Sequence, residues 1–186
     1  MTAPASPDPQ GCSTIGALLL ELATAVDAQR IVATTNSLET PWVSPAADRA
    51  RTQWSQADGR ARTGADELRA LADHLQRLAA GDESLPPPMT WPAQRPPGDP
   101  GPTAPDGVVI VMPEWTAALA EVWHAVATAI TDGLSRARAT PFAPALDAPD
   151  SALLERALGP HSSTALAAQD YRKAAEIAIA EATRAL

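Results

Sequence analysis

The chain has 186 residues, a formal net charge of −8, a hydrophobic share of 45% and an aromatic share of only 4%. Its abundance of alanine, with few aromatic and β-branched residues, favours helices and argues against a β-sandwich or barrel. The acidic balance excludes the clustered cations that nucleic acid or an anionic membrane requires. A single cysteine, Cys12, excludes an internal disulfide framework and a multi-cysteine metal site.

The first residues carry no positive charge and no long apolar run, so we expect no general secretory signal peptide. The apolar runs, such as residues 108–112, are far shorter than the ~18 residues that cross a bilayer, so we expect no membrane span. We therefore expect a cytoplasmic protein whose export, if it occurs, uses an unconventional route.

Residues 1–12 are expected to form a disordered tail, and residues 13–84 a helical hairpin. In its first helix, over residues 13–37, apolar residues recur at three- and four-residue steps along one face. The face comprises Ile15, Leu18, Leu19, Leu22, Val26 and Ala33. Ser44, followed by a proline, supplies an N-cap hydroxyl for the second helix.

The second helix, from residue 45 to about residue 80, carries the strongest signal in the chain. Its apolar stripe follows nine consecutive steps of three and four residues, the spacing of a heptad. The stripe comprises Ala47, Ala50, Trp54, Ala57, Ala61, Gly64, Leu68, Leu71, Leu75 and Leu78. Gly81 follows where a left-handed C-terminal cap is expected. We predict a hairpin seam formed by Leu18, Leu22, Leu68, Leu71, Leu75 and Leu78.

Residues 85–107 contain nine prolines and are predicted to be an extended linker, with a docking motif around Trp91 as the alternative to a plain spacer. Residues 108–186 form the second helical segment. Its single β-like run, residues 108–111, is interpreted as an extended lead-in with no strand to pair with.

Three helices are predicted in this second segment. The first begins at Pro113 and carries a stripe that comprises Trp115, Leu119, Val122, Val126, Ala129, Ile130, Leu134 and Ala137. A short helix is capped by Asp150 and ends at Gly159, and a last helix covers residues 162–186. The fold class is therefore all-α: antiparallel helical hairpins in an elongated assembly resembling a four-helix bundle, joined by a proline-rich linker.

The sequence offers little for catalysis, so we expect no enzyme, catalytic residue, metal or cofactor. Glu121 and His124 have the spacing of a di-iron bundle motif, but no second Glu-x-x-His is present. No phosphate-binding glycine loop or nucleophile elbow occurs. The weaker enzyme alternative is a cryptic site built from scattered carboxylates in the bundle.

The turn between the first two helices, LETPWVSPAADRAR at residues 38–51, is more informative. It places Trp42, a small residue two positions later and a Pro-Ala-Ala-Asp helix start ahead of the long heptad helix with Trp54. This resembles the WXG-motif family of helical hairpins that belong to type VII (ESX) secretion systems, over residues 13–81. Ser44 stands where that family has glycine.

The resemblance implies a hairpin that pairs with another helical-hairpin protein or a secretion component, as a homo- or hetero-dimer, and acts as a secreted substrate, adaptor or chaperone-like partner. The family's Tyr-x-x-x-Asp/Glu export tag is missing after Gly81, and Tyr171 is followed by an acid one position too late, at Glu176. The resemblance makes Trp42, Ser44 and Trp54 the turn and partner residues, and we expect Trp42 to be exposed rather than a buried structural staple.

The alternative function is a cytoplasmic all-helical adaptor or regulatory module unrelated to secretion. Because a two-helix hairpin has too little core to be stable, the missing helices must come either from the C-terminal half of the chain or from a second chain. The length of the linker favours the first answer, since it can reach either end of the hairpin.

Overall fold

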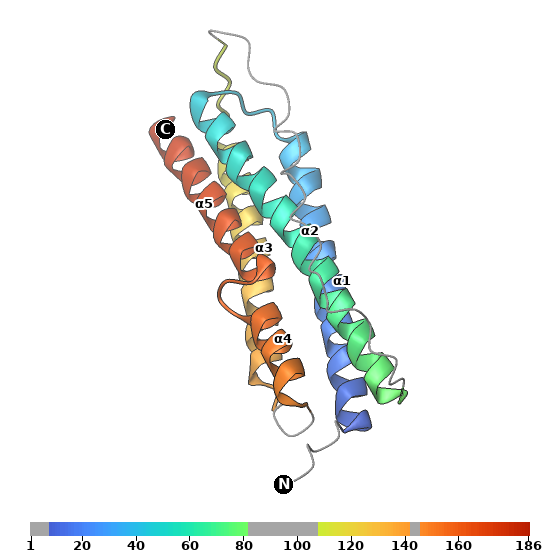
Figure 1. Ribbon diagram of the computed structural model, residues 1–186. Helices are drawn as coiled ribbons and strands as arrows, with labels where there is room; N and C mark the ends of the chain where they lie inside the picture. The colour runs from blue at the N-terminus through green and yellow to red at the C-terminus, as the bar shows by residue number, and fades with distance from the viewer. Residues whose placement is uncertain (1–7, 82–107, 142–145) are drawn as a thin grey trace.

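The computed structural model describes residues 8–81, 108–141 and 146–186, and these form an all-helical bundle (Figure 1). The helices are α1 (Pro9–Glu39), α2 (Pro45–Ala79), α3 (Pro113–Ala139), α4 (Ala148–Leu158) and α5 (Ser163–Arg184). The linker and Trp91 lie outside the described residues. None of the described helices is long and apolar enough to cross a membrane.

The four long helices pack in the order α1, α2, α5, α3 around one core, and neighbours in this ring run antiparallel (Figure 1). A single cluster of buried side chains joins both halves of the chain; its largest members include Leu19, Leu68, Leu71, Trp123 and Tyr171. The C-terminal half therefore supplies the helices that complete the hairpin, as the linker length favours. The short helix α4 lies beside α3 near the end of the bundle opposite the α1–α2 turn (Figure 1).

The ends of the helices follow local capping chemistry. Asp8 accepts hydrogen bonds from Gln10 and Gly11, so α1 begins at Pro9, and residues 9–12 are helical rather than part of a tail. Cys12 is fully buried in this first turn. Gly81 adopts a φ of 71°, the left-handed conformation that was expected for the cap of α2.

The heptad of α2 is confirmed in its register. Eight of its ten positions are buried, and Trp54 and Leu78 are half-buried against the core. The helix also buries a second stripe that includes Ala46, Thr63, Ala65 and Ala72, because α2 packs against α5 as well as α1. Periodicity alone did not identify this second face.

The predicted face of α3 is wrong at its first turn. Trp115 is 49% exposed, whereas Trp123 and Thr116 are fully buried. Trp115 and Trp123 are eight positions apart, a spacing that is compatible with one apolar stripe along a helix. Trp123 is the one that is buried, because α1 packs against the side of α3 that bears it. The cap of α4 is also corrected: Asp147, not Asp150, accepts from the backbone N–H of Asp150 at 2.9 Å.

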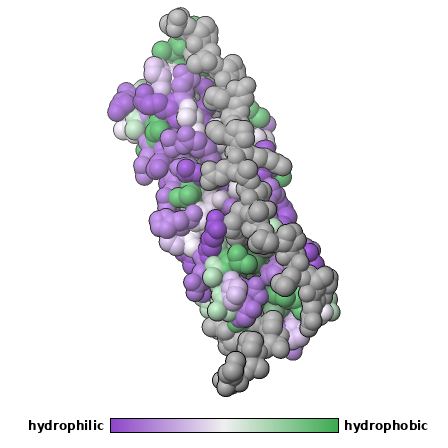
Figure 2. All heavy atoms as spheres, viewed as in Figure 1, coloured by the Kyte–Doolittle hydropathy of each residue, from purple (hydrophilic) through white to green (hydrophobic). Residues whose placement is uncertain are grey.

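Polar contacts between α1 and α2 form a row of alternating charges. It comprises Arg62, Asp58, Arg30, Asp27, Arg69 and Asp66, each within ion-pair distance of the next. We call these six residues the charge ladder. Across the bundle, Arg60 of α2 pairs with the buried Asp170 of α5, which Lys173 also approaches at 3.6 Å. On the face shown in Figure 2, hydrophilic side chains predominate, with small hydrophobic areas between them.

Candidate interaction site at the turn end

The α1–α2 turn, the start of α3 and the end of α5 lie together at one end of the bundle, which we call the turn end (Figure 1). The turn is fixed by Ser44, whose hydroxyl accepts a hydrogen bond from Ala47 N–H at 3.0 Å, the N-cap role that the sequence predicts. Next to it, Val43 and Ile110 form an antiparallel β-bridge through two hydrogen bonds of 2.8 and 2.7 Å. The run at residues 108–111 therefore has a pairing partner, contrary to expectation.

Trp42 is buried, so the expectation that it is exposed at the turn is wrong. Its side chain is 1% exposed, and Arg51 donates a hydrogen bond to its carbonyl oxygen. The indole Nε1 has no hydrogen-bond partner in the part of the chain that the structure describes. Proline at 41 and the bridge at Val43 hold the backbone so that the intervening indole turns into the core. Trp42 therefore packs in the core at the turn that connects α1 and α2.

Beneath the turn, the indole N–H of Trp123 donates to Ser37 Oγ at 3.0 Å, and Ser37 Oγ donates to Ala33 O at 2.6 Å. This buried bond links α3 to the last turns of α1. Because buried polar groups are costly unless paired, it fixes the relative position of these two helices. Neither residue was singled out from the sequence, since a serine near a helix end reads as an ordinary turn residue.

The turn end exposes a group of apolar side chains. Five residues with exposed fractions between 40% and 65% form what we call the turn-end patch: Val108, Val109, Ile110, Met112 and Trp115. Most large apolar side chains of a stable domain are buried, and a local concentration of exposed ones marks an interaction surface. The patch adjoins a cavity of about 280 Å³ between the start of α3 and the end of α5, lined by apolar residues that include Pro113, Ala117 and Ile179.

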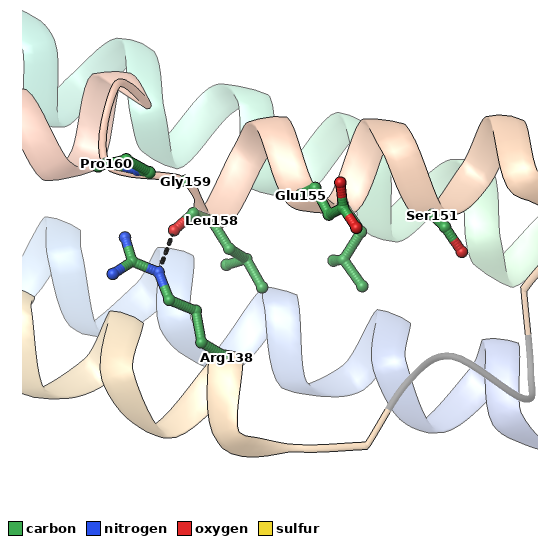
Figure 3. Close-up of a pocket in the computed structure, with 7 residues that line it drawn as sticks. Arg138, Ser151, Glu155, Leu158, Gly159 and Pro160 are labelled. Atoms are coloured by element: carbon green, nitrogen blue, oxygen red, sulfur yellow. Dashed lines mark hydrogen bonds between the residues drawn. The ribbon is translucent and has the colours of Figure 1, made fainter.

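A larger cavity, of about 460 Å³, lies between α3 and α4 at the opposite end of the bundle. Figure 3 shows Arg138 reaching from α3 to the carbonyl oxygen of Leu158, to which its Nε donates a hydrogen bond. Ser151 and Glu155 of α4 are the other polar side chains that line it. The polar side chains that line this cavity are thus one carboxylate, one hydroxyl and a guanidinium that is engaged in a structural hydrogen bond.

Other titratable groups lie outside these two cavities. Glu121 and His124 are both exposed on α3, and the described residues contain no group of three or more histidine, cysteine or acidic side chains able to hold a metal ion. Burial, with the charges of Asp150, Asp8 and Asp147, raises the pKa of the Cys12 thiol. A raised pKa keeps the sulfur protonated and a poor nucleophile at neutral pH.

The predicted seam residues divide by depth. Leu22, Leu68, Leu71 and Leu75 are buried, whereas Leu18 and Leu78 are half-buried and pack against the edge of the core. Trp54 is half-buried in α2, not at the turn end's surface. Tyr171 is fully buried, and burial raises the pKa of its hydroxyl. In the folded bundle, the Tyr171 side chain is therefore inaccessible to any protein that would recognise it as part of an export tag.

No protein family model, curated protein or solved structure matches this chain.

Proposed function

We propose that this chain is a non-enzymatic, protein-binding helical bundle associated with type VII secretion, as a substrate, adaptor or chaperone-like partner. The observation that carries the proposal is the exposed turn-end patch on a bundle whose four long helices pack against one another within the chain. The tight turn at residues 42–44, followed by a long heptad helix, supports the association with this secretion system.

The patch suits protein recognition because aromatic and methionine side chains supply much of the energy of interface cores. Trp115 and Met112 are such residues, and both are exposed next to an apolar cavity. Trp42 contributes indirectly, by holding the turn that carries Val43 and hence Ile110. Ser44 acts in the same way, through its cap on α2.

The test is detection of the protein in culture filtrate of its host, with and without a working type VII ATPase. We expect ATPase-dependent appearance in the filtrate for a substrate, and ATPase-independent retention with binding to a secretion component for an adaptor. Retention without any such binding would overturn the association and favour the alternative, a cytoplasmic adaptor.

A variant pair tests whether the patch is the binding surface. Trp115→Ser removes an exposed aromatic at the turn end, and Leu20→Ser removes a 37% exposed apolar side chain from the middle of α1. We expect the first variant to lose export or partner binding and the second to retain it, with both melting near the wild-type temperature. Equal effects of the two substitutions would exclude a specific role for the patch.

A further inference from the structure

The segment 108–112 has one paired edge and one open edge. Ile110 directs both its N–H and its C=O towards Val43. In an extended chain, the backbone groups of the two flanking residues point the opposite way. Val109 and Val111 therefore present their N–H and C=O groups outwards, and no described backbone group bonds to them.

The sequence of the segment itself offers this open edge no protection against pairing. Residues 108–112 are Val-Val-Ile-Val-Met, without charge, glycine or proline, and Val109 is the most exposed of them at 65%. Natural proteins commonly protect open edges with charges, proline or bulges, because an unpaired row of N–H and C=O groups is a template for another strand. Here Pro113 ends the segment only at the start of α3.

We infer that a second copy of this chain pairs with the open edge, as an antiparallel two-stranded contact across a two-fold axis at Ile110. This inference rests on the proposed role of the patch as a binding surface, and it names the partner. The register is self-complementary: Val109 lies opposite the partner's Val111, and Val111 opposite the partner's Val109. Each such pair exchanges two hydrogen bonds, and a two-fold contact closes on itself as a dimer.

Charge permits this association. Each copy carries a net charge of −8, which opposes contact between two broad surfaces. The paired segment itself is uncharged and lies at the end of a bundle whose helix α2, with 35 residues, is about 52 Å long. Most of the two acidic surfaces therefore stay well beyond the Debye length, about 8 Å at physiological salt.

Area sets the strength of the contact. A standard stable interface buries about 800 Å² on each partner, or some 20 to 30 residues a side. The turn-end patch has five residues, each with about half of its surface exposed. The dimer is accordingly weak, with a dissociation constant that we expect to be micromolar or higher, and the patch is accessible to other partners at low concentration.

Sedimentation velocity of the full chain over a range of concentrations, from about 0.1 μM to about 1 mM, brackets such an affinity. We expect the wild type to shift from monomer to dimer across this range. Val109→Pro removes an outward N–H and should stay monomeric with an unchanged far-ultraviolet circular dichroism spectrum. Val109→Thr, which keeps the backbone donor and the β-branched shape, should dimerise like the wild type.

Amide hydrogen exchange of the wild type gives a readout without substitution. The amides of Val109 and Val111 should exchange several-fold more slowly at the high concentration, while the amide of Ile110, already bonded to Val43, should change little. A wild type that stays monomeric, or a Val109→Pro variant that dimerises, would overturn the inference.

This experiment separates the inference from the proposed function. It measures self-association of the purified protein, whereas the filtrate assay measures export. A monomeric protein that is exported would overturn the dimer alone, and a dimer that neither leaves the cell nor binds a secretion component would overturn the secretion role alone.

Discussion

Gly64 of α2 lies directly against the backbone of Thr164, in the first turn of α5. A Cβ atom at Gly64 would come within 2.7 Å of Thr164 N, closer than non-bonded atoms approach. Thr164 is itself buried. Helix propensity alone makes Gly64 a weak point that costs about 1 kcal/mol relative to alanine. The packing explains why glycine occupies a helix interior here.

Gly64→Ala is therefore expected to destabilise the protein by about 1 to 3 kcal/mol, the range for overpacking a tight contact. Urea unfolding followed by circular dichroism measures the change. The exposed Ala70 on the same helix provides the control, since Ala70→Gly reports the propensity difference alone, about 1 kcal/mol. A stabilised Gly64→Ala variant would show that α5 moves away at no cost.

Trp42→Ala should lower the free energy of unfolding by about 3 to 5 kcal/mol, because it empties a site that is 1% exposed. Trp42→Phe is the matched variant: it retains much of the apolar volume and removes the Nε1–H group that has no described partner. We expect Phe to cost much less than Ala in chemical denaturation. Equal losses would contradict the view that apolar volume is the main contribution of Trp42.

A fragment that ends at Gly81 should be molten or aggregated. It retains α1 and α2 but loses α5, which covers the second buried stripe of α2, and α3, which buries Trp123 against α1. Near-ultraviolet circular dichroism and binding of a hydrophobic dye compare the fragment with the full chain. A monomeric fragment with sharp tertiary signals would show that the hairpin folds independently.

Glu67→Gln should raise the melting temperature at pH 7. Burial raises the pKa of Glu67, partly offset by the hydrogen bond that Ser163 Oγ donates to its carboxylate at 3.1 Å. A folded-state pKa above the unfolded value means that this residue's stabilising contribution is present in acid and is lost as pH rises through the folded-state pKa. The advantage of glutamine should therefore disappear near pH 4.

A melting temperature of Glu67→Gln below that of the wild type at pH 7 would contradict this account. Glu67→Ala separates charge from hydrogen bonding, since it removes both the carboxylate and the acceptor for Ser163. We expect it to be less stable than Glu67→Gln at every pH.

His74→Ala should loosen α4. The His74 ring accounts for a polar contact of 2.8 Å with the Asp150 carboxylate, and both side chains are nearly buried. Without it, the nearly buried Asp150 carboxyl group loses the hydrogen-bond partner that His74 supplies, which is costly away from water. Hydrogen exchange should accelerate in residues 148–158 and remain unchanged in α1. His124→Ala, at an exposed site, should leave α4 protection as in the wild type.

The sequence predicted the helices better than it predicted which faces they bury. The heptad of α2 was readable because leucine and alanine alternate with charged residues over nine steps. Trp115 and Trp123 share a possible stripe, and only the position of α1 selects Trp123 for the core. The start of α1 was missed because prolines and small polar residues suggest a tail, whereas Asp8 and Pro9 make a cap.

At the site, Ser44 was predictable as a cap because its role is local. The Val43–Ile110 bridge was not, because it joins residues that are 67 positions apart and separated by a proline-rich segment. Burial of Trp42 depends on that same long-range contact. Pairings of this kind are set by tertiary structure, and neither periodicity nor local propensity identifies them.

The charge ladder also determines how far α2 can slide along α1. Beside the ladder, the stripe of α2 consists of the small residues Ala57, Ala61 and Gly64, so apolar packing there distinguishes poorly between alignments that differ by one helical turn. Moving α2 by four residues in one direction would place Asp73 opposite Asp27 and Arg62 opposite Arg30, which sets like charges against each other. Moving α2 by four residues in the other direction would place the uncharged Ala65 opposite Asp27 and Trp54 opposite Arg30, so both ion pairs would be lost. The charge ladder thus favours one longitudinal alignment of α2 along α1 among several that packing of the small residues would allow.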